Sequence, residues 1–285
     1  MTAKILDGLL VSQYVKNELK YAILKLNEDD VYPCLATILI GSDPASISYV
    51  NNKQKTAKSI GIKTLDYRLD ENTNQNDLAN LINKLNNDRD VHGILVQLPL
   101  QNHLDKFYIL NLIDTKKDVD GLTFLNSGLL LNNRSRLIPC TPLGVITLID
   151  YYNIDLDGSN VAIINRSNLV GKPLCSLLLE RNSTVVICHS HTKMIGRFLQ
   201  NSDIIITAVG NRHRFKLTKN MVKENSVVID VGTSRVDGKL LGDVDFDEVK
   251  EKASYITPVP GGVGPMTIAM LLKNTVQAAK ILNSL

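Results

Sequence analysis

Tyr49 and Lys53 are the residues of this chain whose types and spacing first suggest chemistry. They stand four positions apart in a helix-like run that follows the loop 41–44, so both side chains should lie on one helical face. A phenol beside an amine can orient a planar substrate and move a proton, provided that burial or neighbouring groups lower the pKa of the lysine. The same spacing is common among exposed residues of amphipathic helices, so other segments must support this interpretation.

Gln97 and Asp120 supply that support from two further segments. Gln97 stands near the end of an apolar predicted strand, and Asp120 lies in a polar turn shortly after it. In open parallel sheets, ligands bind beyond the carboxyl ends of the strands, where these side chains and the Tyr49–Lys53 pair would converge. An amide and a carboxylate together can read a heterocycle with adjacent donor and acceptor atoms. In the alternative interpretation, Gln97 caps a strand end, and Asp118 and Asp120 only form the turn.

The loop 165–173 joins a second buried strand to a helix, which is the topological place for a pyrophosphate. It lacks the G-x-G-x-x-G pattern. Arg166 in this loop, with His189 and Ser190 at the next strand end, can surround a ribose 2′-phosphate, and this favours NADP over NAD. In the alternative interpretation, His189 and Ser190 are ordinary turn residues.

Strands alternate with helices along the whole chain, which predicts an α/β protein with parallel sheets. We expect two domains with a cleft between them. The first is an N-terminal α/β catalytic domain of residues 1–143 plus 266–285. The second is a Rossmann-like NAD(P)-binding domain of residues 144–265. The Gly- and Pro-rich segment 257–267 either approaches a ligand or links the domains rigidly.

Composition narrows the class of protein. Of the 285 residues, 44% are apolar and 21% charged, as in ordinary globular proteins. The net charge of +3 and the absence of a basic run interleaved with aromatics argue against nucleic-acid binding. No signal-peptide pattern and no membrane-spanning stretch are expected. The four separated cysteines predict reduced thiols in a cytoplasmic protein without a metal site: Cys34, Cys140, Cys175 and Cys188.

Several motifs together resemble one family, the bifunctional methylenetetrahydrofolate dehydrogenase/methenyltetrahydrofolate cyclohydrolases (FolD). They occur in the order found in that family, across nearly the whole chain. The matching segments are Ser48-Tyr49-Val50 with Lys53, 93–100, 117–121, 139–142, Arg166-Ser167 with 170–173, 228–232, 242–244 and 258–267.

The resemblance implies a role for each matched residue. Lys53 would move protons in the cyclohydrolase step, and Tyr49 would stack on the folate. Gln97 and Asp120 would hold the lysine and the pterin, completing the catalytic set. The dinucleotide would contact Cys140, Thr141, Asn165, Arg166, Ser167, His189, Ser190, Thr233 and Thr267, and the folate would contact Tyr49, Gln97, Leu98, Pro99, Asp120, Pro260, Gly261 and Gly262.

The resemblance also implies an activity. Such an enzyme oxidises 5,10-methylenetetrahydrofolate with NADP, or alternatively with NAD, and hydrolyses the methenyl product to 10-formyltetrahydrofolate. These reactions serve tetrahydrofolate interconversion in one-carbon metabolism and purine biosynthesis. The family needs no metal and is usually a homodimer.

Two departures from the family pattern fall on the dinucleotide side. Asn165 stands where the family normally has glycine, and the segment 210–215 replaces a shorter turn while adding Arg212 and Arg214. They bear on cofactor affinity and choice. They also sustain an alternative, a non-catalytic or cyclohydrolase-only protein that binds folate or dinucleotide with impaired cofactor use.

Two other enzyme families fit the sequence less well. In short-chain dehydrogenases, which also use Y-x-x-x-K, the nucleotide motif precedes the dyad, whereas here Tyr49 comes before the nucleotide unit. Shikimate-type dehydrogenases place the substrate domain first, as here, but their motifs do not match.

Overall fold

The computed structural model describes residues 2–285, which divide into two compact units. The six-strand unit comprises the N-terminal residues through Gln13 and Thr141–Thr267. The three-strand unit comprises Tyr14–Cys140 and Ile268–Leu285. Helices α1 (Gly8–Glu28) and α10 (Val263–Leu282) contribute residues to both units.

The three-strand unit is built on a parallel sheet with the order β3-β2-β4. The central strand is β2 (Cys34–Ile40), flanked by β3 (Lys63–Leu69) and β4 (Gly93–Val96). All seven residues of β2 are buried, as expected of a central strand covered on both faces. Besides its parts of α1 and α10, the helices of this unit are α2 (Pro44–Ser59), α3 (Gln75–Asn87), α4 (Lys106–Asn111) and α5 (Phe124–Leu131).

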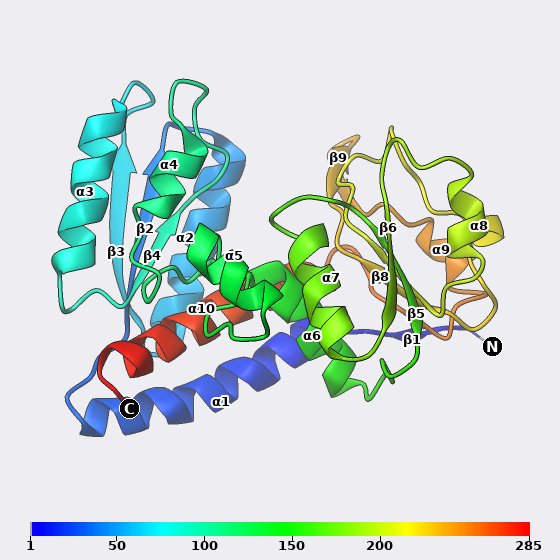
Figure 1. Cartoon of the computed structure of the whole chain (residues 1–285), viewed down its shortest axis with the longest axis horizontal. Coiled ribbons are helices and arrows are strands. Elements are labelled where there is room, and N and C mark those ends of the chain that lie inside the picture. Colours follow the sequence, from blue (N-terminus) through cyan, green and yellow to red (C-terminus); the bar gives the residue numbers. More distant parts are fainter. Residues whose placement is uncertain (1) are drawn as a thin grey trace. The chain divides into compact units, whose positions relative to one another are not determined.

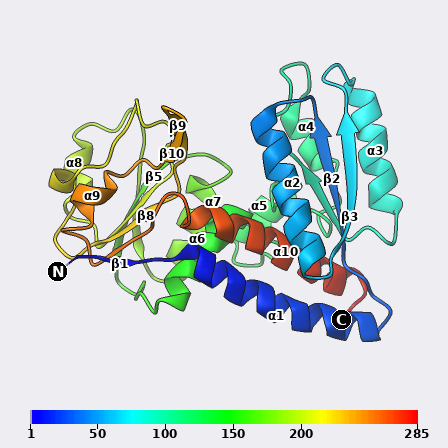
Figure 2. The same cartoon turned by 180° about the vertical axis from the view of Figure 1, so that it is seen from behind.

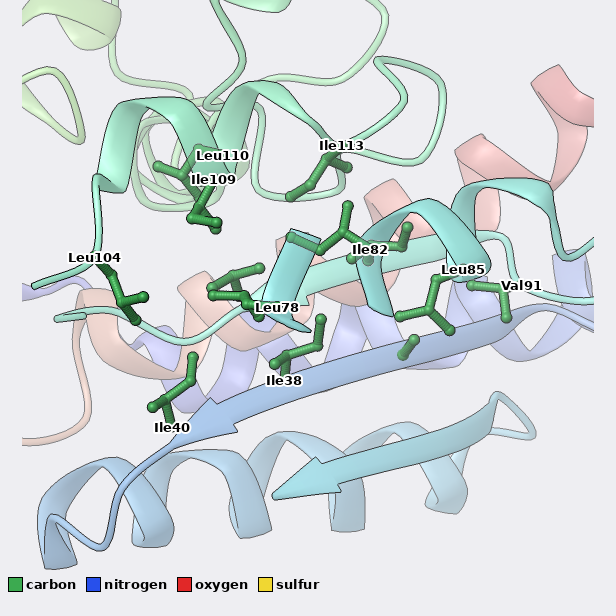
Figure 3. Close-up of a cluster of buried hydrophobic side chains, with 13 residues drawn as sticks. Ile38, Ile40, Leu78, Ile82, Leu85, Val91, Leu104, Ile109, Leu110 and Ile113 are labelled. Atoms are coloured by element: carbon green, nitrogen blue, oxygen red, sulfur yellow. The ribbon is translucent and has the colours of Figure 1, made fainter. Parts of the chain in front are cut away.

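One hydrophobic cluster fixes α3 and α4 against this sheet (Figure 3). Ile38 and Ile40 point from β2 toward Leu78 and Ile82 of α3, and Ile109 approaches from α4. Because successive strand residues face opposite sides, the intervening residues of β2 face the other layer, where α2 lies (Figure 2). This packing orients α2, the helix that carries Tyr49 and Lys53.

The six-strand unit holds a parallel sheet with the order β1-β11-β8-β7-β5-β6. Figure 1 shows α6 and α7 on one side of it and α8 and α9 on the other. Its strands are β1 (Lys4–Ile5), β5 (Asn160–Ile164), β6 (Thr184–Cys188), β7 (Ile204–Thr207), β8 (Val227–Asp230) and β11 (Tyr255–Ile256). The other elements are α6 (Cys140–Tyr151), α7 (Gly171–Glu180), α8 (Ile195–Leu199), a 3₁₀ turn at Lys219–Met221, a hairpin of β9 (Ser234–Val236) and β10 (Lys239–Leu241), and α9 (Phe246–Val249).

The strand order reverses between β5 and β7. The chain runs outward from β5 to β6, then returns to place β7 on the other side of β5. Ligands of such sheets bind beyond the strand ends at this switch point. The loop 165–173 leaves β5 there, as expected for a dinucleotide site.

The α/β class and the parallel sheets predicted from sequence are confirmed. Three details differ. The strand predicted over 93–100 ends at Val96, and α4 and α5 were not foreseen. Residues 4–5, which the sequence analysis assigned to the catalytic domain, form β1, which pairs with β11 of the six-strand unit. No helix within residues 2–285 is long and apolar enough to cross a membrane.

Candidate functional site

Helix α2 begins where the chain leaves β2, and its start is fixed by a side-chain cap. Asp43 accepts a hydrogen bond from the Ser46 amide at 2.7 Å, and Pro44 occupies the first helical turn. The cap lowers the pKa of Asp43, because the amide hydrogen bond favours its charged form. Along this helix Tyr49 is 51% exposed and Lys53 is half-buried. A phenol ring is therefore open to a ligand, with an amine one turn further on.

Lys53 is oriented by the residue that follows strand β4. Its amine donates a hydrogen bond to Gln97 Oε1 at 3.0 Å, and Gln97 Nε2 donates to the Leu98 carbonyl at 2.7 Å. Because both ends of the Gln97 amide are engaged, the amide holds one orientation and presents its oxygen to the lysine. The predicted association of Lys53 with Gln97 is therefore present in the structure.

The turn after β4 separates the roles of its two aspartates. Asp118 is 1% exposed and accepts hydrogen bonds from the backbone N–H groups of Leu122 and Thr123 and from Asn126 Nδ2. It is the turn former that the sequence analysis considered. Asp120, two residues on, is half-buried, and its carboxyl group lies near the Lys53 amine.

Asp120 experiences opposing electrostatic effects. Burial raises its pKa, the Lys53 ammonium acts against that rise, and the nearby Asp118 carboxylate adds to it. The Cys140 thiol lies beside the Asp120 carboxyl group and, like Lys53, acts against the rise of its pKa. Burial and the Asp120 charge raise the pKa of Cys140 well above the usual range, so the thiol stays protonated and is not a nucleophile.

Asn274 of α10 supports this turn and was not found from sequence. Its Nδ2 donates to the carbonyls of Val119 and Ile138, both at 2.8 Å, and it is 3% exposed. Val119 directly precedes Asp120, and Ile138 lies two residues before Cys140. A single buried amide thus ties together the two segments that carry Asp120 and Cys140.

These groups can perform proton transfer on a planar ligand. Burial raises the pKa of the Asp120 carboxyl group, while the Lys53 ammonium lowers it. Gln97 supplies a fixed acceptor, and Tyr49 an exposed aromatic face. An amine, an amide and a carboxyl group near the strand ends suit general acid–base catalysis on a heterocycle.

In the six-strand unit, Asn165 organises the loop after β5. Its Nδ2 donates to the Ala208 carbonyl beyond β7 at 2.6 Å. Its Oδ1 accepts from the amides of Ser167 at 2.7 Å and Gly171 at 3.1 Å. The side chain is therefore turned into its own loop and spans the switch point between β5 and β7.

Arg166 and His189 supply positive and neutral donors beside this loop. Arg166 is exposed and makes no ion pair within residues 2–285. The pKa of His189 is lowered by partial desolvation and by the Arg166 charge, so the imidazole is mostly neutral at pH 7. No acidic residue follows β6, where Cys188 is succeeded by His189 and Ser190. The donor set fits a phosphorylated dinucleotide.

Comparison with known proteins agrees with both sets of residues. The model of the tetrahydrofolate dehydrogenase/cyclohydrolase catalytic domain matches residues 6–120, and the model of the NAD(P)-binding domain of the same family matches residues 139–283. The chain belongs to the tetrahydrofolate dehydrogenase/cyclohydrolase family. The resemblance stated from the sequence is thereby confirmed.

Named relatives of this family match over nearly their whole length. The bifunctional protein FolD of Nitrosopumilus maritimus is 53% identical over 281 residues, covering 99% of this chain and 98% of the relative. The FolD of Cenarchaeum symbiosum is 55% identical over 280 residues, covering 98% and 99%.

Solved structures of FolD enzymes agree with this family assignment. The crystal structure of the bifunctional enzyme FolD from Campylobacter jejuni superposes with a TM-score of 0.96 at 49% identity, covering 99% of this chain and 100% of that one. The FolD of Trypanosoma brucei, complexed with NADP cofactor and inhibitor, has a TM-score of 0.93 at 35% identity, covering 99% and 98%.

The family's implied dinucleotide residues fall into two groups here. Cys140 is 2% exposed and its thiol donates to the Val119 carbonyl at 3.3 Å, so it lies beneath the Asp120 turn in the three-strand unit. All of the others lie in the six-strand unit. Thr141 and Thr267 share a hydrogen bond of 3.0 Å, and Thr233 is exposed after β8.

The implied folate residues are divided in the same way. Tyr49, Gln97 and Asp120 belong to the three-strand unit, together with Leu98 and Pro99, which follow β4. Pro260, Gly261 and Gly262 belong to the six-strand unit, between β11 and α10. Among residues 2–285, no cluster of three or more His, Cys, Asp or Glu side chains is arranged to hold a metal ion.

Proposed function

We propose that the chain oxidises 5,10-methylenetetrahydrofolate to the 5,10-methenyl cation and then hydrolyses that cation to 10-formyltetrahydrofolate. The observation that carries this proposal is the contact between Lys53 and Gln97 beside the Asp120 carboxyl group. Family membership supports it across nearly the whole chain.

In the hydrolytic step, we infer that Lys53 moves the protons. Water adds to the methenyl carbon and loses one proton. The hydroxyl group that results then loses its own proton as the C=O bond forms, the bond from that carbon to one ring nitrogen breaks, and this nitrogen takes up a proton. Gln97 holds the amine in place for these transfers, because its Oε1 accepts the lysine hydrogen bond. Asp120 holds the pterin, and Tyr49 offers an exposed ring on which it stacks.

In the oxidative step, we infer that the six-strand unit holds NADP. When bound, its nicotinamide supplies the acceptor for the hydride that leaves the methylene carbon. Arg166 binds the 2′-phosphate with His189 and Ser190, and Ser167 orders the loop that receives the pyrophosphate. Support comes from Arg166, which forms no ion pair within residues 2–285, and from the neutral His189 beside it. NAD remains the alternative cofactor.

The test replaces Lys53 with methionine, which keeps the length of the side chain but removes the amine. Hydrolysis of the methenyl substrate, followed by loss of its absorbance, should fall at least about 100-fold. Lys55→Met, which alters an exposed lysine of the same helix, is the matched control and should leave the rate unchanged. Full cyclohydrolase activity in Lys53→Met would reject the assignment.

The oxidative half is tested separately by titrating NADP and NAD against methylenetetrahydrofolate and following the absorbance of the reduced cofactor. A higher kcat/KM with NADP is expected. If neither cofactor is reduced while methenyl hydrolysis persists, the cyclohydrolase-only alternative holds instead.

We further propose that the protein is a homodimer in which a second copy pairs along β6. This strand is an edge of the six-stranded sheet, and an unprotected edge is a template for pairing. Val186 is 37% exposed on it, beside the exposed side chains of Met194 and Phe198, and all three line a hollow of about 480 Å³. Light scattering on the purified protein should give a molar mass of twice the chain mass. In Phe198→Asp the measured mass should fall toward that of a single chain.

We place the protein in the cytoplasm, and its four free cysteines agree with this location. We also assign folate chemistry to residues 1–143 plus 266–285 and dinucleotide binding to residues 144–265, with β1 joining the dinucleotide part because it pairs with β11.

A further inference from the structure

The Asp243 carboxylate is buried and anchors the turn that follows β7. It accepts hydrogen bonds from Thr207 Oγ1 at 2.6 Å, from the Val209 amide at 2.7 Å and from the Gly210 amide at 3.0 Å. Asp243 itself is 0% exposed. The path of the chain beyond β7 is therefore set by a side chain that lies more than thirty residues later in the sequence.

Asp230, the last residue of β8, makes the complementary set of contacts. Its carboxylate accepts hydrogen bonds from the amides of Gly232 at 3.0 Å, Asp243 at 3.1 Å and Val244 at 2.8 Å. It thus fixes both the turn after its own strand and the segment that carries Asp243. Asp230 therefore holds the backbone of the segment that carries Asp243, and Asp243 in turn holds the turn after β7.

Two glycines make room for this arrangement. A Cβ atom at Gly232 would lie 2.1 Å from Asp243 Oδ2, and one at Gly242 would lie 1.9 Å from Asp230 Oδ2. Any other residue at either position would displace a carboxylate. The sequence pairs Asp230 with Gly232 and Gly242 with Asp243 because each carboxylate occupies the space above the other segment's glycine.

Arg212 closes the arrangement from the loop that departs from the family pattern. Its Nη1 donates to the carbonyls of Gly242 at 2.6 Å and Val244 at 2.8 Å, and its backbone amide donates to Ser234 Oγ at 3.0 Å. The guanidinium is therefore bound to the backbone on either side of Asp243. The charge added by Arg212 is engaged within the protein.

The two turns held in this way follow neighbouring strands of the parallel sheet. Gly210 lies beyond β7, and Thr233 lies beyond β8, on the edge where such sheets bind dinucleotides. A binding loop that is already in its bound shape loses less conformational freedom when the ligand arrives. Fixing these turns should therefore strengthen dinucleotide binding.

We propose that Asp230, Asp243 and Arg212 form a clasp that holds the turns after β7 and β8 in the shape that receives the dinucleotide. They are positioning residues, because they act on the ligand through the backbone. The proposal rests on the proposed dehydrogenase function. Burial raises the pKa of Asp230 to about 7 and the Asp243 carboxylate adds to the rise, which agrees with the closeness of the two side chains.

The first test compares Arg212→Met with Arg214→Met in the full-length protein. Arg214 lies exposed in the same loop, and its backbone amide donates to Asn211 Oδ1. Its side chain forms no ion pair or hydrogen bond within residues 2–285, so Arg214→Met is the matched control. Titration calorimetry with NADP should show a Kd raised about tenfold, or 1.4 kcal/mol, in Arg212→Met and unchanged in Arg214→Met. Arg212→Lys, which retains donors, should recover part of the loss.

The second test uses Asp243→Asn, with Asp237→Asn in the β9–β10 hairpin as control. In the unaltered protein the Val209 and Gly210 amides donate to the Asp243 carboxylate. Asparagine replaces one of its oxygens with an NH2 group, which cannot accept a hydrogen bond from these amides. Hydrogen exchange of the Val209 and Gly210 amides, measured without cofactor, should accelerate in Asp243→Asn and in Arg212→Met, and in neither control.

The activities separate this proposal from the function on which it rests. In both clasp variants the KM for NADP should rise, while methenyl hydrolysis stays within about twofold of the unaltered protein. Unchanged NADP affinity, or an equal loss of both activities, would overturn the clasp as a positioning device. Failure of the unaltered protein to reduce either cofactor would instead overturn the dehydrogenase function.

Discussion

Asn165 Nδ2 donates a hydrogen bond to the Ala208 carbonyl at 2.6 Å, across the point where the strand order of the six-stranded sheet reverses. By sequence, Asn165 departs from the family pattern in a way that bears on cofactor affinity, because asparagine is bulkier than glycine. The structure shows how its bulk is accommodated. The amide group satisfies three backbone groups around the loop, so the side chain acts as a brace.

We therefore predict that Asn165→Gly, which restores the family pattern, weakens NADP binding. The Ala208 carbonyl and the Ser167 and Gly171 amides lose their partner, and glycine adds backbone freedom to the loop. The Kd for NADP, measured by calorimetry, should rise about 5- to 50-fold, which corresponds to roughly 1–2 kcal/mol. A tighter complex in the glycine variant would show that crowding by Asn165 outweighs the bracing.

Asp230 should give the folding stability a characteristic pH dependence. Its pKa is raised from 3.8 to about 7 in the folded protein, so the folded state binds the proton more tightly than the unfolded chain. The resulting stabilisation is complete below about pH 4, declines as the pH rises toward 7, and is absent above it. The expected span is on the order of a few kcal/mol.

Urea unfolding between pH 4 and pH 8 measures this effect. The difference in unfolding free energy between the unaltered protein and Asp230→Asn should shrink steadily as the pH rises to about 7, and then stay constant. Asp237→Asn alters an exposed carboxylate and should give a flat difference. A difference that grows with pH would mean that the pKa of Asp230 is lowered in the folded state.

Gln97 should matter for hydrolysis more than for oxidation. Gln97→Leu removes the acceptor of the Lys53 hydrogen bond and replaces the amide side chain with an apolar one of similar size. Cyclohydrolase kcat should fall about 10- to 100-fold because the amine loses its orientation, and the affinity for NADP should stay the same. Gln101→Leu, which alters an amide that donates to the Ile40 carbonyl, is the control. Equal cyclohydrolase rates in the two variants would contradict the role of Gln97.

How much of this site the sequence reveals depends on how local each contact is. Tyr49 and Lys53 are four residues apart on one helix, and Gln97 directly follows the apolar strand β4. The helical periodicity of the sequence and the end of an apolar run are therefore enough to find these three residues. Asn165 was singled out only as an exception to a motif. Its brace could not be foreseen, because the Ala208 carbonyl is placed by the sheet order and not by spacing.

The clasp was beyond sequence reasoning for the same reason. The segments around Asp230 and Asp243 were noticed as family motifs, yet nothing local indicates that each carboxylate lies over the other's glycine. The roles of Asp118 and Asp120 were also left open. Only the structure shows that three donors engage Asp118, while the Asp120 carboxyl group lies near Lys53.

Asn274 provides the last prediction, since it links the final helix to the catalytic turn. Asn274→Leu leaves the carbonyls of Val119 and Ile138 without the donor that now serves both. The Ile138 carbonyl loses its donor, and the Val119 carbonyl keeps only the weak donor of the Cys140 thiol. Urea unfolding should therefore show a loss of about 1–3 kcal/mol, while Lys273→Met on the exposed side should change little. Cyclohydrolase activity should fall further than the unfolded fraction explains, because Asp120 follows Val119 directly. If activity per folded molecule is unchanged, Asn274 supports the fold alone and does not position Asp120.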